Sequence, residues 1–313
     1  MAYQTSTTIA SCQLLINAIA IFVATAGWTV ERNVLSGANR TVTLRKVGTT
    51  DYIHLFNTAN DAIRMRASVG YDDAQPIASQ PNVTPADSIV NNLLGPYPTV
   101  WMFASGDNVH VVVRRSDITG GYTHLLFGAV SKYGAYAGGT YIEGTYFDST
   151  GGGSGSWSGS DHAPFGLGSQ SLGYIRCDAD AQVNKWWALR EPNTALYAWG
   201  NVCPPTSVQS YTGYGDISRW LYAADDNVFS GRSFLHVIDV FVPRDGGSLY
   251  ASPIGYADNL RLVSLAKFEP EQEITIASET WTVFPIARKA APGSASGAPI
   301  GTGDMGYAIR KVA

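Results

Sequence analysis

The chain has 313 residues, of which 45% are hydrophobic, 12% aromatic and 15% charged, and its formal net charge is −4. This composition excludes an intrinsically disordered chain and is sufficient for a large core in one or two domains. Lys and Arg occur at most in adjacent pairs, so the chain has no basic stripe for a phosphate backbone, and nucleic acid is not an expected partner.

The cysteines are Cys12, Cys177 and Cys203. Their number is odd and no CxxC spacing occurs, which argues against a disulfide framework and against a thiolate metal cluster. We therefore expect reduced thiols in a protein that folds in the cytoplasm.

Residues 9–26 form an apolar stretch that resembles a signal peptide or a membrane anchor. No Lys or Arg precedes Arg32, and Gln13 and Asn17 interrupt the stretch, so we expect neither a signal nor membrane insertion. The spacing instead predicts one amphipathic helix whose core-facing side consists of Leu14, Leu15, Ala18, Ile21, Phe22 and Thr25.

A pattern of alternating apolar and polar residues follows the helix and predicts strands, with Val42 and Leu44 pointing inward. Turn sequences rich in Gly and Asp join the later strands at hairpin spacing. The first half is therefore predicted to be an antiparallel meander, with strands in residues 40–47, 51–56, 62–69, 99–104, 108–115 and 122–133.

Residues 79–97 interrupt this meander with several prolines. They predict an excursion of loop and short helix, with Thr84 or Asp87 as its N-cap.

Residues 148–169 are rich in Gly and Ser and have linker chemistry, although Trp157 and Phe165 suggest two fixed points. They are either a boundary between subdomains or a long interaction loop. The predicted division is a helix and β-meander subdomain in residues 1–147, this linker or loop, and a C-terminal β subdomain in residues 170–313.

The second half repeats the strand signal less regularly. Residues 233–244 form a long apolar run that predicts a strand buried on both faces, and residues 185–190 and 195–200 predict short aromatic strands. A hairpin is predicted from Glu273 to Lys289, then a projecting loop rich in Gly, Ser, Ala and Pro, and a last strand in residues 306–312. The fold class is thus mainly β, with antiparallel sheets, sandwich or barrel-like, and one N-terminal amphipathic helix.

Motifs for catalysis or metal binding are weak. Ser154 lies in a Gly-rich stretch without the strained turn of a hydrolase nucleophile, and the histidines lack metal-ligand spacing. The pairs Asp72–Asp73 and Asp178–Asp180 could hold calcium or act as paired acids, but solvated turns are the favoured interpretation. We therefore expect no enzyme, no cofactor and no metal site.

Aromatic residues crowd a stretch of the second half that has few charges. Three roles stay open for them: filling a β core, anchoring an assembly interface, or stacking on sugar rings. The candidate interface or glycan-contact residues are Trp186, Trp187, Trp199, Tyr211, Tyr214 and Trp220.

The order of landmarks along the chain resembles that of virion structural proteins of tailed bacteriophages, of the kind found among tail and baseplate genes. The segments that carry the resemblance are GWTVERN, SVGYDDAQ, TVWMFASGDNVHVVV, HLLFGAVSKYGAYAGGTYIEG, SPIGYADNLRLVSL, EITIASETWTVFPIARK and GYAIRKVA. The resemblance implies a protein made in the bacterial host cytoplasm that ends in the virion tail, bound to copies of itself and to other tail proteins.

We therefore expect a non-enzymatic structural component of a phage virion, at the tail tip or baseplate, in a symmetric homo-oligomer. One alternative is a receptor- or carbohydrate-binding tail protein that contacts the host surface. A collar or tail-terminator protein is the alternative within the structural class. The enzymatic alternative is a glycan depolymerase that uses Asp178 and Asp180.

Overall fold

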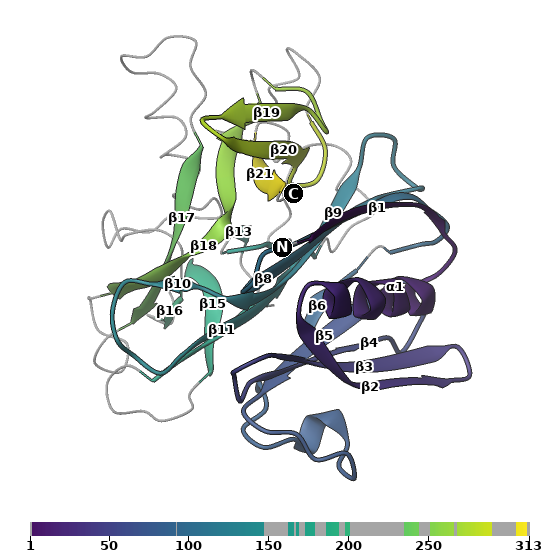
Figure 1. Cartoon of the computed structure of the whole chain (residues 1–313), viewed down its shortest axis with the longest axis vertical. Coiled ribbons are helices and arrows are strands. Elements are labelled where there is room, and N and C mark those ends of the chain that lie inside the picture. The colour runs from purple at the N-terminus through teal and green to yellow at the C-terminus, as the bar shows by residue number, and fades with distance from the viewer. Residues whose placement is uncertain are drawn as a thin grey trace.

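The protein is mainly β, with antiparallel sheets stacked in layers and one α-helix in the described part of the chain, which confirms the predicted fold class. Figure 1 shows the layers, with the C-terminal strands on one side of a long central sheet and the N-terminal strands and helix on the other. The computed structural model describes residues 2–91, 93–146, 162–165, 167–168, 173–178, 186–193, 198–200, 235–243, 251–265, 268–289 and 305–311.

The central sheet has eight strands in the order β1-β7-β8-β9-β11-β14-β15-β16. Their bounds are β1 Ala2–Ile9, β7 Tyr97–Ala104, β8 Asn108–Arg114, β9 Tyr122–Ala129, β11 Gly138–Gly144, β14 Gly173–Cys177, β15 Trp186–Asn193 and β16 Ala198–Gly200. Because β11 pairs with β14, this sheet continues across residues 148–169, where the sequence predicts a linker or loop. The division into two subdomains stays a prediction.

A second sheet, here called the N-terminal sheet, has five strands in chain order and packs with helix α1 (Cys12–Thr25) on one face of the central sheet. Val42 and Leu44 are fully buried in this layer, as predicted. The strands are β2 Trp28–Ser36, β3 Asn39–Lys46, β4 Tyr52–Phe56, β5 Ile63–Ser68 and β6 Ser88–Val90.

The predicted core-facing side of α1 is wrong in part. Leu15 and Phe22 are buried, but Leu14 is 45% exposed and Ile21 is 61% exposed. The residues of α1 in the core are Cys12, Leu15, Ile16, Ile19, Ala20, Phe22 and Val23. The helix carries apolar residues on opposite sides, so periodicity alone did not single out the side that packs on the sheets.

The third sheet, here called the C-terminal sheet, has six strands and covers the other face of the central sheet. Its strands are β10 Ser131–Lys132, β17 His236–Pro243, β18 Ala251–Ser264, β19 Glu273–Ile276, β20 Glu279–Pro285 and β21 Met305–Lys311. Its strand β21 brings the last described residue close to the first strand of the chain: the Lys311 ammonium lies 4.4 Å from the centre of the Tyr3 ring. A short ribbon, β12 His162–Ala163 with β13 Leu167–Gly168, completes the described strands.

The predicted C-terminal hairpin and last strand are confirmed, because β19 pairs with β20 and β20 pairs with β21. The predicted projecting loop between them lies outside the described residues. The prediction for residues 233–244 is wrong for the described side chains of β17, where Ile238 and Val240 are buried but Val237 is 46% exposed. β17 pairs only with β18 among the described strands, so its other edge is unpaired there.

The excursion between β5 and β6 contains one 3-10 turn, η1 (Ile77–Ser79), and no helix capped by Thr84 or Asp87. The Thr84 hydroxyl donates to the Ala86 carbonyl at 3.1 Å. The Asp87 carboxylate instead binds Arg64 and Arg66 of the adjacent strand β5. Both residues stabilise the return of the chain to the sheet, so the predicted cap is wrong.

Candidate functional site

The structure places only part of the predicted aromatic set. Trp186 begins β15 and is 8% exposed, with its indole N–H donating to the Asn82 carbonyl at 2.7 Å. Of the three roles that the sequence leaves open, Trp186 therefore has the first, which is to fill the β core. Trp187 and Trp199 lie in β15 and β16, but their side chains, together with Tyr211, Tyr214 and Trp220, lie outside the described residues. Their roles stay predictions.

The structure describes both members of the pair Asp72–Asp73 but only one member of the pair Asp178–Asp180. Asp72 accepts from the backbone N–H of Ala74 in a local turn, and Asp73 pairs with Arg32 at 3.3 Å. Asp178 follows β14, and Asp180 lies outside the described residues. Within the part of the chain that the structure describes, no three His, Cys, Asp or Glu side chains form a group that could hold a metal ion.

A buried histidine pair joins the central sheet to the C-terminal sheet. His124 Nε2 lies 2.8 Å from the Pro285 carbonyl, and His124 Nδ1 lies 3.0 Å from His110 Nε2. The carbonyl can only accept, so His124 Nε2 donates to it, and His124 Nδ1 then accepts from His110 in the neutral pair. The Tyr307 ring packs edge-on against both imidazoles.

Burial keeps both imidazoles neutral. It lowers the pKa of His124 to about 4, although the bond to Pro285 opposes this shift. Burial, and then the neighbouring His124, hold the pKa of His110 well below its ordinary value. Their exposed fractions are 1% for His110 and 0% for His124, so neither ring reaches solvent. The pair therefore holds two layers together rather than facing a substrate.

A third histidine lies in the N-terminal sheet. Ser68 donates its hydroxyl proton to the Gly70 carbonyl at 2.6 Å, so it accepts from His54 Nε2 at 2.9 Å. His54 Nδ1 then accepts from the Thr43 hydroxyl at 3.1 Å. The serine is fully buried and its proton is engaged, so this Ser–His contact links strands and does not present a nucleophile.

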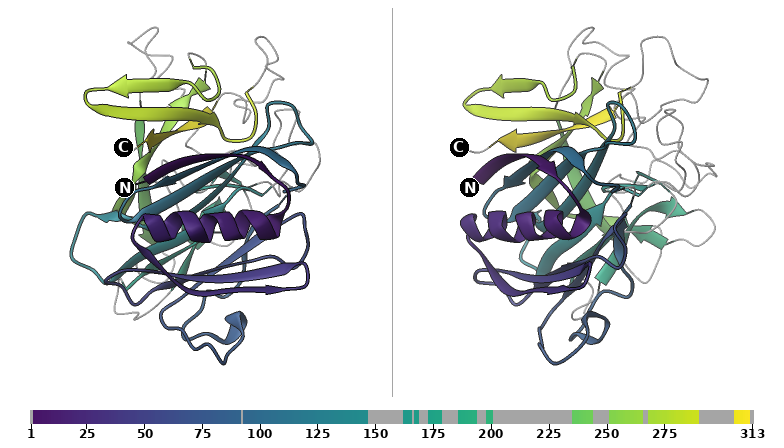
Figure 2. Two further views of the ribbon diagram at one scale, coloured as in Figure 1. Left: turned by 45° about the vertical axis from the view of Figure 1, so that its right-hand side comes forward. Right: turned by 90° about the vertical axis from the view of Figure 1, so that its right-hand side faces the viewer.

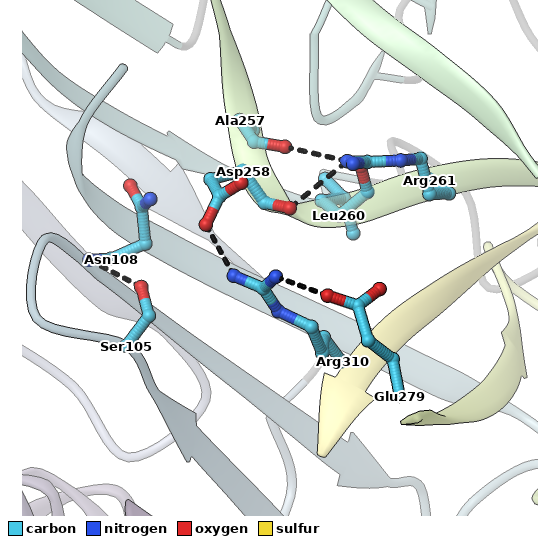
Figure 3. Close-up of polar contacts among 8 residues, drawn as sticks. All are labelled: Ser105, Asn108, Ala257, Asp258, Leu260, Arg261, Glu279 and Arg310. Atoms are coloured by element: carbon cyan, nitrogen blue, oxygen red, sulfur yellow. Dashed lines mark hydrogen bonds and ion pairs between the residues drawn. The ribbon is translucent and has the colours of Figure 1, made fainter. Parts of the chain in front are cut away.

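The outer face of the C-terminal sheet carries a fork of charges, which Figure 3 shows in close-up. One arm of the Arg310 guanidinium donates to Glu279 at 2.7 Å, and the other arm donates to Asp258. These residues belong to β21, β20 and β18, so the fork ties three neighbouring strands.

Arg261 completes this cluster. Its guanidinium donates to three backbone carbonyls of its own strand, at 3.3 Å to Ala257, 3.0 Å to Asp258 and 2.7 Å to Leu260. The buried Trp281 ring lies 5.1 Å from the Arg261 guanidinium and 5.9 Å from that of Arg310. Each charge has partners within the sheet. The cluster therefore stabilises the outer face and is not a candidate binding site.

The outward side of α1 differs from the charged outer face of the C-terminal sheet, because it is apolar and uncharged. It consists of Leu14, Ala18, Ile21 and Thr25, which we call the outward face of α1. Among the 14 residues of the helix none is charged. In both views of Figure 2 the helix lies at the outside of the molecule, and in the left view no described ribbon passes in front of it.

A hydrogen bond joins α1 to β2 beside this surface. The side-chain amide of Asn33 donates to Asn17 at 3.0 Å, so the helix and strand lie side by side there. Leu35 follows in the exposed end of β2 and is 51% exposed. α1 is apolar on two opposite sides, and a helix surface of this kind is normally covered. The outward face of α1 is therefore the candidate functional surface.

Sequence reasoning named the residues of this surface but assigned them to the core. It missed the histidine pair, because His110 and His124 come together only when β8 pairs with β9, and Pro285 lies 161 residues from His124. The only signal for that pair was the presence of polar histidines in otherwise apolar strands.

The described residues contain no helix with the length and hydropathy that a membrane crossing requires. Comparison of the sequence with protein-family models and with curated proteins found no match.

Proposed function

We propose that the protein is a non-enzymatic structural subunit of a bacteriophage virion, located at the tail tip or baseplate and assembled as a symmetric homo-oligomer. The order of sequence landmarks from GWTVERN to GYAIRKVA supports the phage assignment. The open, uncharged outward face of α1 supports the assembly role, and it is the single structural observation on which that role rests.

Apolar side chains that stay in contact with water are unfavourable in free energy. Leu14 and Ile21 are each about half exposed or more, and no charged residue of α1 interrupts the surface between them. Burial of a wholly exposed Leu or Ile side chain is worth about 2 kcal/mol, and roughly half of this is left to gain here, so a partner that covers this face still gains free energy. Contiguous exposed apolar surfaces mark interaction sites in soluble proteins.

The experiment is mass spectrometry of purified virions of the phage that encodes the chain. We expect peptides of this chain in a fixed ratio to the other tail proteins. Immunogold labelling with an antibody to the chain then gives its position, and label at the distal end of the tail is the expected result. Label at the head–tail junction would replace the tail-tip proposal by the collar alternative, and absence from virions would overturn the structural proposal.

A further inference from the structure

Strand β1 forms one edge of the central sheet, and among the described strands it pairs only with β7. Its register with β7 is unbroken from Ala2 to Thr7, and no residue of the strand is charged or is a proline. The left-handed φ of 60° at Thr8 ends this regular part. Charges, prolines, short length and register breaks are the features that keep natural sheet edges from pairing with other chains. The edge of β1 is therefore unprotected.

The other edges of the three large sheets are protected in the described part of the chain. The central sheet ends on its far side in β16, which has three residues. The N-terminal sheet ends in β6, which has three residues, and in β2, which contains Glu31 and Arg32 and has a register shift there. In the C-terminal sheet, β19 has four residues and begins with Glu273, β10 has two residues, and the register of β17 with β18 shifts twice. β1 thus differs from every other described edge strand.

We propose that β1 pairs in antiparallel orientation with β1 of a second copy of this chain, so that the two central sheets continue through a two-fold axis. The proposal rests on the homo-oligomeric assembly proposed above and names a contact that produces it. Main-chain N–H and C=O groups along a strand edge pair in a regular row only with another extended strand. The edge itself therefore specifies the conformation of its partner.

The side chains of β1 suit pairing of the strand with itself. Across a two-fold axis the strand meets its own residues, so a charge on it would face a like charge nearby and destabilise the pair. β1 has only neutral side chains, and its exposed Thr5 and Thr7 are of a residue type that forms favourable cross-strand pairs. The Lys311 ammonium, which lies against the Tyr3 ring, is itself paired with Glu273 at 2.8 Å.

A second copy of β1 is also the best-matched strand that the chain offers. No other described edge strand combines the length of β1 with an unbroken register and the absence of charge. An edge that is short or charged would leave part of the β1 main chain unpaired or would bring charge into the contact.

The antiparallel orientation follows from the use of one edge. Copies joined head to tail use opposite edges of a strand, and the other edge of β1 is occupied by β7. A two-fold axis perpendicular to the sheet joins the same edge of both copies and makes the two strands antiparallel. Both copies then keep α1 and the N-terminal sheet on the same side of the continuous sheet.

β1 and α1 occupy neighbouring parts of the molecule. The chain passes from one to the other through Ala10 and Ser11, and in both views of Figure 2 β1 runs just above α1. A second copy that pairs with β1 therefore also comes close to α1, the element that carries the candidate functional surface.

The contact is small, and this bounds its strength. One strand from each copy covers less than the about 800 Å² per partner of a standard interface. We therefore expect a reversible dimer with a micromolar dissociation constant, which a larger assembly reinforces through further contacts.

The first test is sedimentation velocity of the purified full chain at concentrations up to about 100 µM, where a micromolar dimer is mostly formed. We expect a monomer–dimer equilibrium in the wild type. Thr5→Lys is expected to weaken it at least roughly tenfold, because an edge lysine opposes strand pairing and two ammonium groups approach each other near the axis. Thr5 is exposed, so the variant retains the monomer fold, which its circular dichroism and melting temperature check.

Thr275→Lys is the matched control. Thr275 is also an exposed threonine of an edge strand, but its strand, β19, is short and contains Glu273. The same substitution there is expected to leave the equilibrium unchanged. Equal weakening by both variants, or a wild type that stays monomeric throughout the concentration range, overturns the proposal.

Cross-linking of single cysteines identifies the contact and its orientation. Facing residues of antiparallel strands have Cα atoms about 4.5–5.5 Å apart, which is within reach of a disulfide. Each variant is oxidised alone and in pairwise mixtures with the others, against the wild-type background. The variants are Gln4→Cys, Thr5→Cys, Ser6→Cys and Thr7→Cys.

In an antiparallel pair, the two positions that face each other always have the same sum. We therefore expect the strongest cross-links at position pairs that share one sum. Cross-links of every position with itself alone would show a parallel pair, and no cross-link at any position would show that β1 lies outside the contact. Either result contradicts the proposal.

The two proposals fail separately. If the chain is found in virions and forms oligomers that Thr5→Lys leaves intact, the strand pair is wrong and the virion assignment stands. If the strand pair forms in solution but the chain is absent from virions, the reverse holds.

Discussion

The two faces of the central sheet are covered by layers of different chemistry. The face toward α1 and the N-terminal sheet is largely aliphatic, with Val, Leu, Ile and Met side chains from the helix and both sheets in one cluster. The face toward the C-terminal sheet is richer in aromatic rings and contains the His110–His124 pair. The first contact depends on volume and shape, whereas the second also depends on polar partners that must stay satisfied.

This difference predicts different responses to mutation and to pH. Substitutions that remove side-chain volume are expected to lower the free energy of unfolding most on the aliphatic side. Lowering the pH is expected to weaken the aromatic side, because the neutral imidazoles of His110 and His124 are buried there and would have to take up protons. The outward face of α1 is a third environment. Its side chains are largely exposed, so they contribute little to the free energy of unfolding of the isolated chain.

The largest expected effect is a cavity under α1. Ile19 of α1 is fully buried where the helix packs on the sheets, so Ile19→Ala is expected to lower the free energy of unfolding by about 3 kcal/mol. Ile21→Ala removes the same atoms from the outward face of the same helix and is expected to cost less than about 0.5 kcal/mol at dilute concentration. Urea unfolding of both variants gives the comparison, and similar losses would contradict the assignment of the two faces.

The next effect concerns pH. The pKa of His124 is about 4 in the fold, below the ordinary value of 6.5, so the unfolded chain binds the extra proton first. The stability that neutral His124 contributes is therefore complete above pH 6.5 and is lost as the pH falls toward 4. The loss at pH 4 is expected to be on the order of 3 kcal/mol.

His124→Gln isolates this contribution, because an amide can donate to Pro285 and accept from His110 without titrating. Urea unfolding across this pH range is expected to show a flatter dependence for the variant than for the wild type. The fold has a further acid-sensitive group in His54, whose pKa burial also lowers to about 4, so some dependence remains. Parallel curves for wild type and His124→Gln would contradict the role given to the pair.

A smaller effect is expected at the outer face of the C-terminal sheet. The Arg310 side chain is 17% exposed, but its partners Asp258 and Glu279 are 35% and 43% exposed, so solvent screens the attraction. Arg310→Ala is expected to cost about 1 kcal/mol, including the lost packing on Trp281. Arg310→Lys, which keeps the charge but not the two-armed geometry, is expected to recover only part of it. Full recovery would show that charge alone matters there.

Much of the fold was predictable where apolar and polar residues alternate along a strand. Val42 and Leu44 alternate with polar residues and lie in the core, and the hairpin from Glu273 has its turn between β19 and β20 as expected. In these segments a single pattern fits a single structure, since a shift by one residue would expose every apolar side chain.

The candidate surface could not be predicted in the same way. α1 is apolar on opposite sides, so its periodicity fits two orientations, and only packing against the sheets distinguishes Ile19 from Ile21. In β17, an apolar run predicted burial on both faces, but Val237 is 46% exposed, so one of its described faces is open there. Apolar residues that serve an interface carry the same signal as those that serve a core.

Thiol labelling at position 21 tests the central claim, that the outward face of α1 is an assembly surface, most directly. Ile21→Cys and the control Ile276→Cys are each labelled with a maleimide, at dilute concentration and in the assembled protein, against the wild-type background. We predict that assembly slows labelling at position 21 by at least roughly tenfold, since a covered thiol is inaccessible, and leaves position 276 unchanged. Equal labelling rates at position 21 in the dilute and assembled protein would contradict the account.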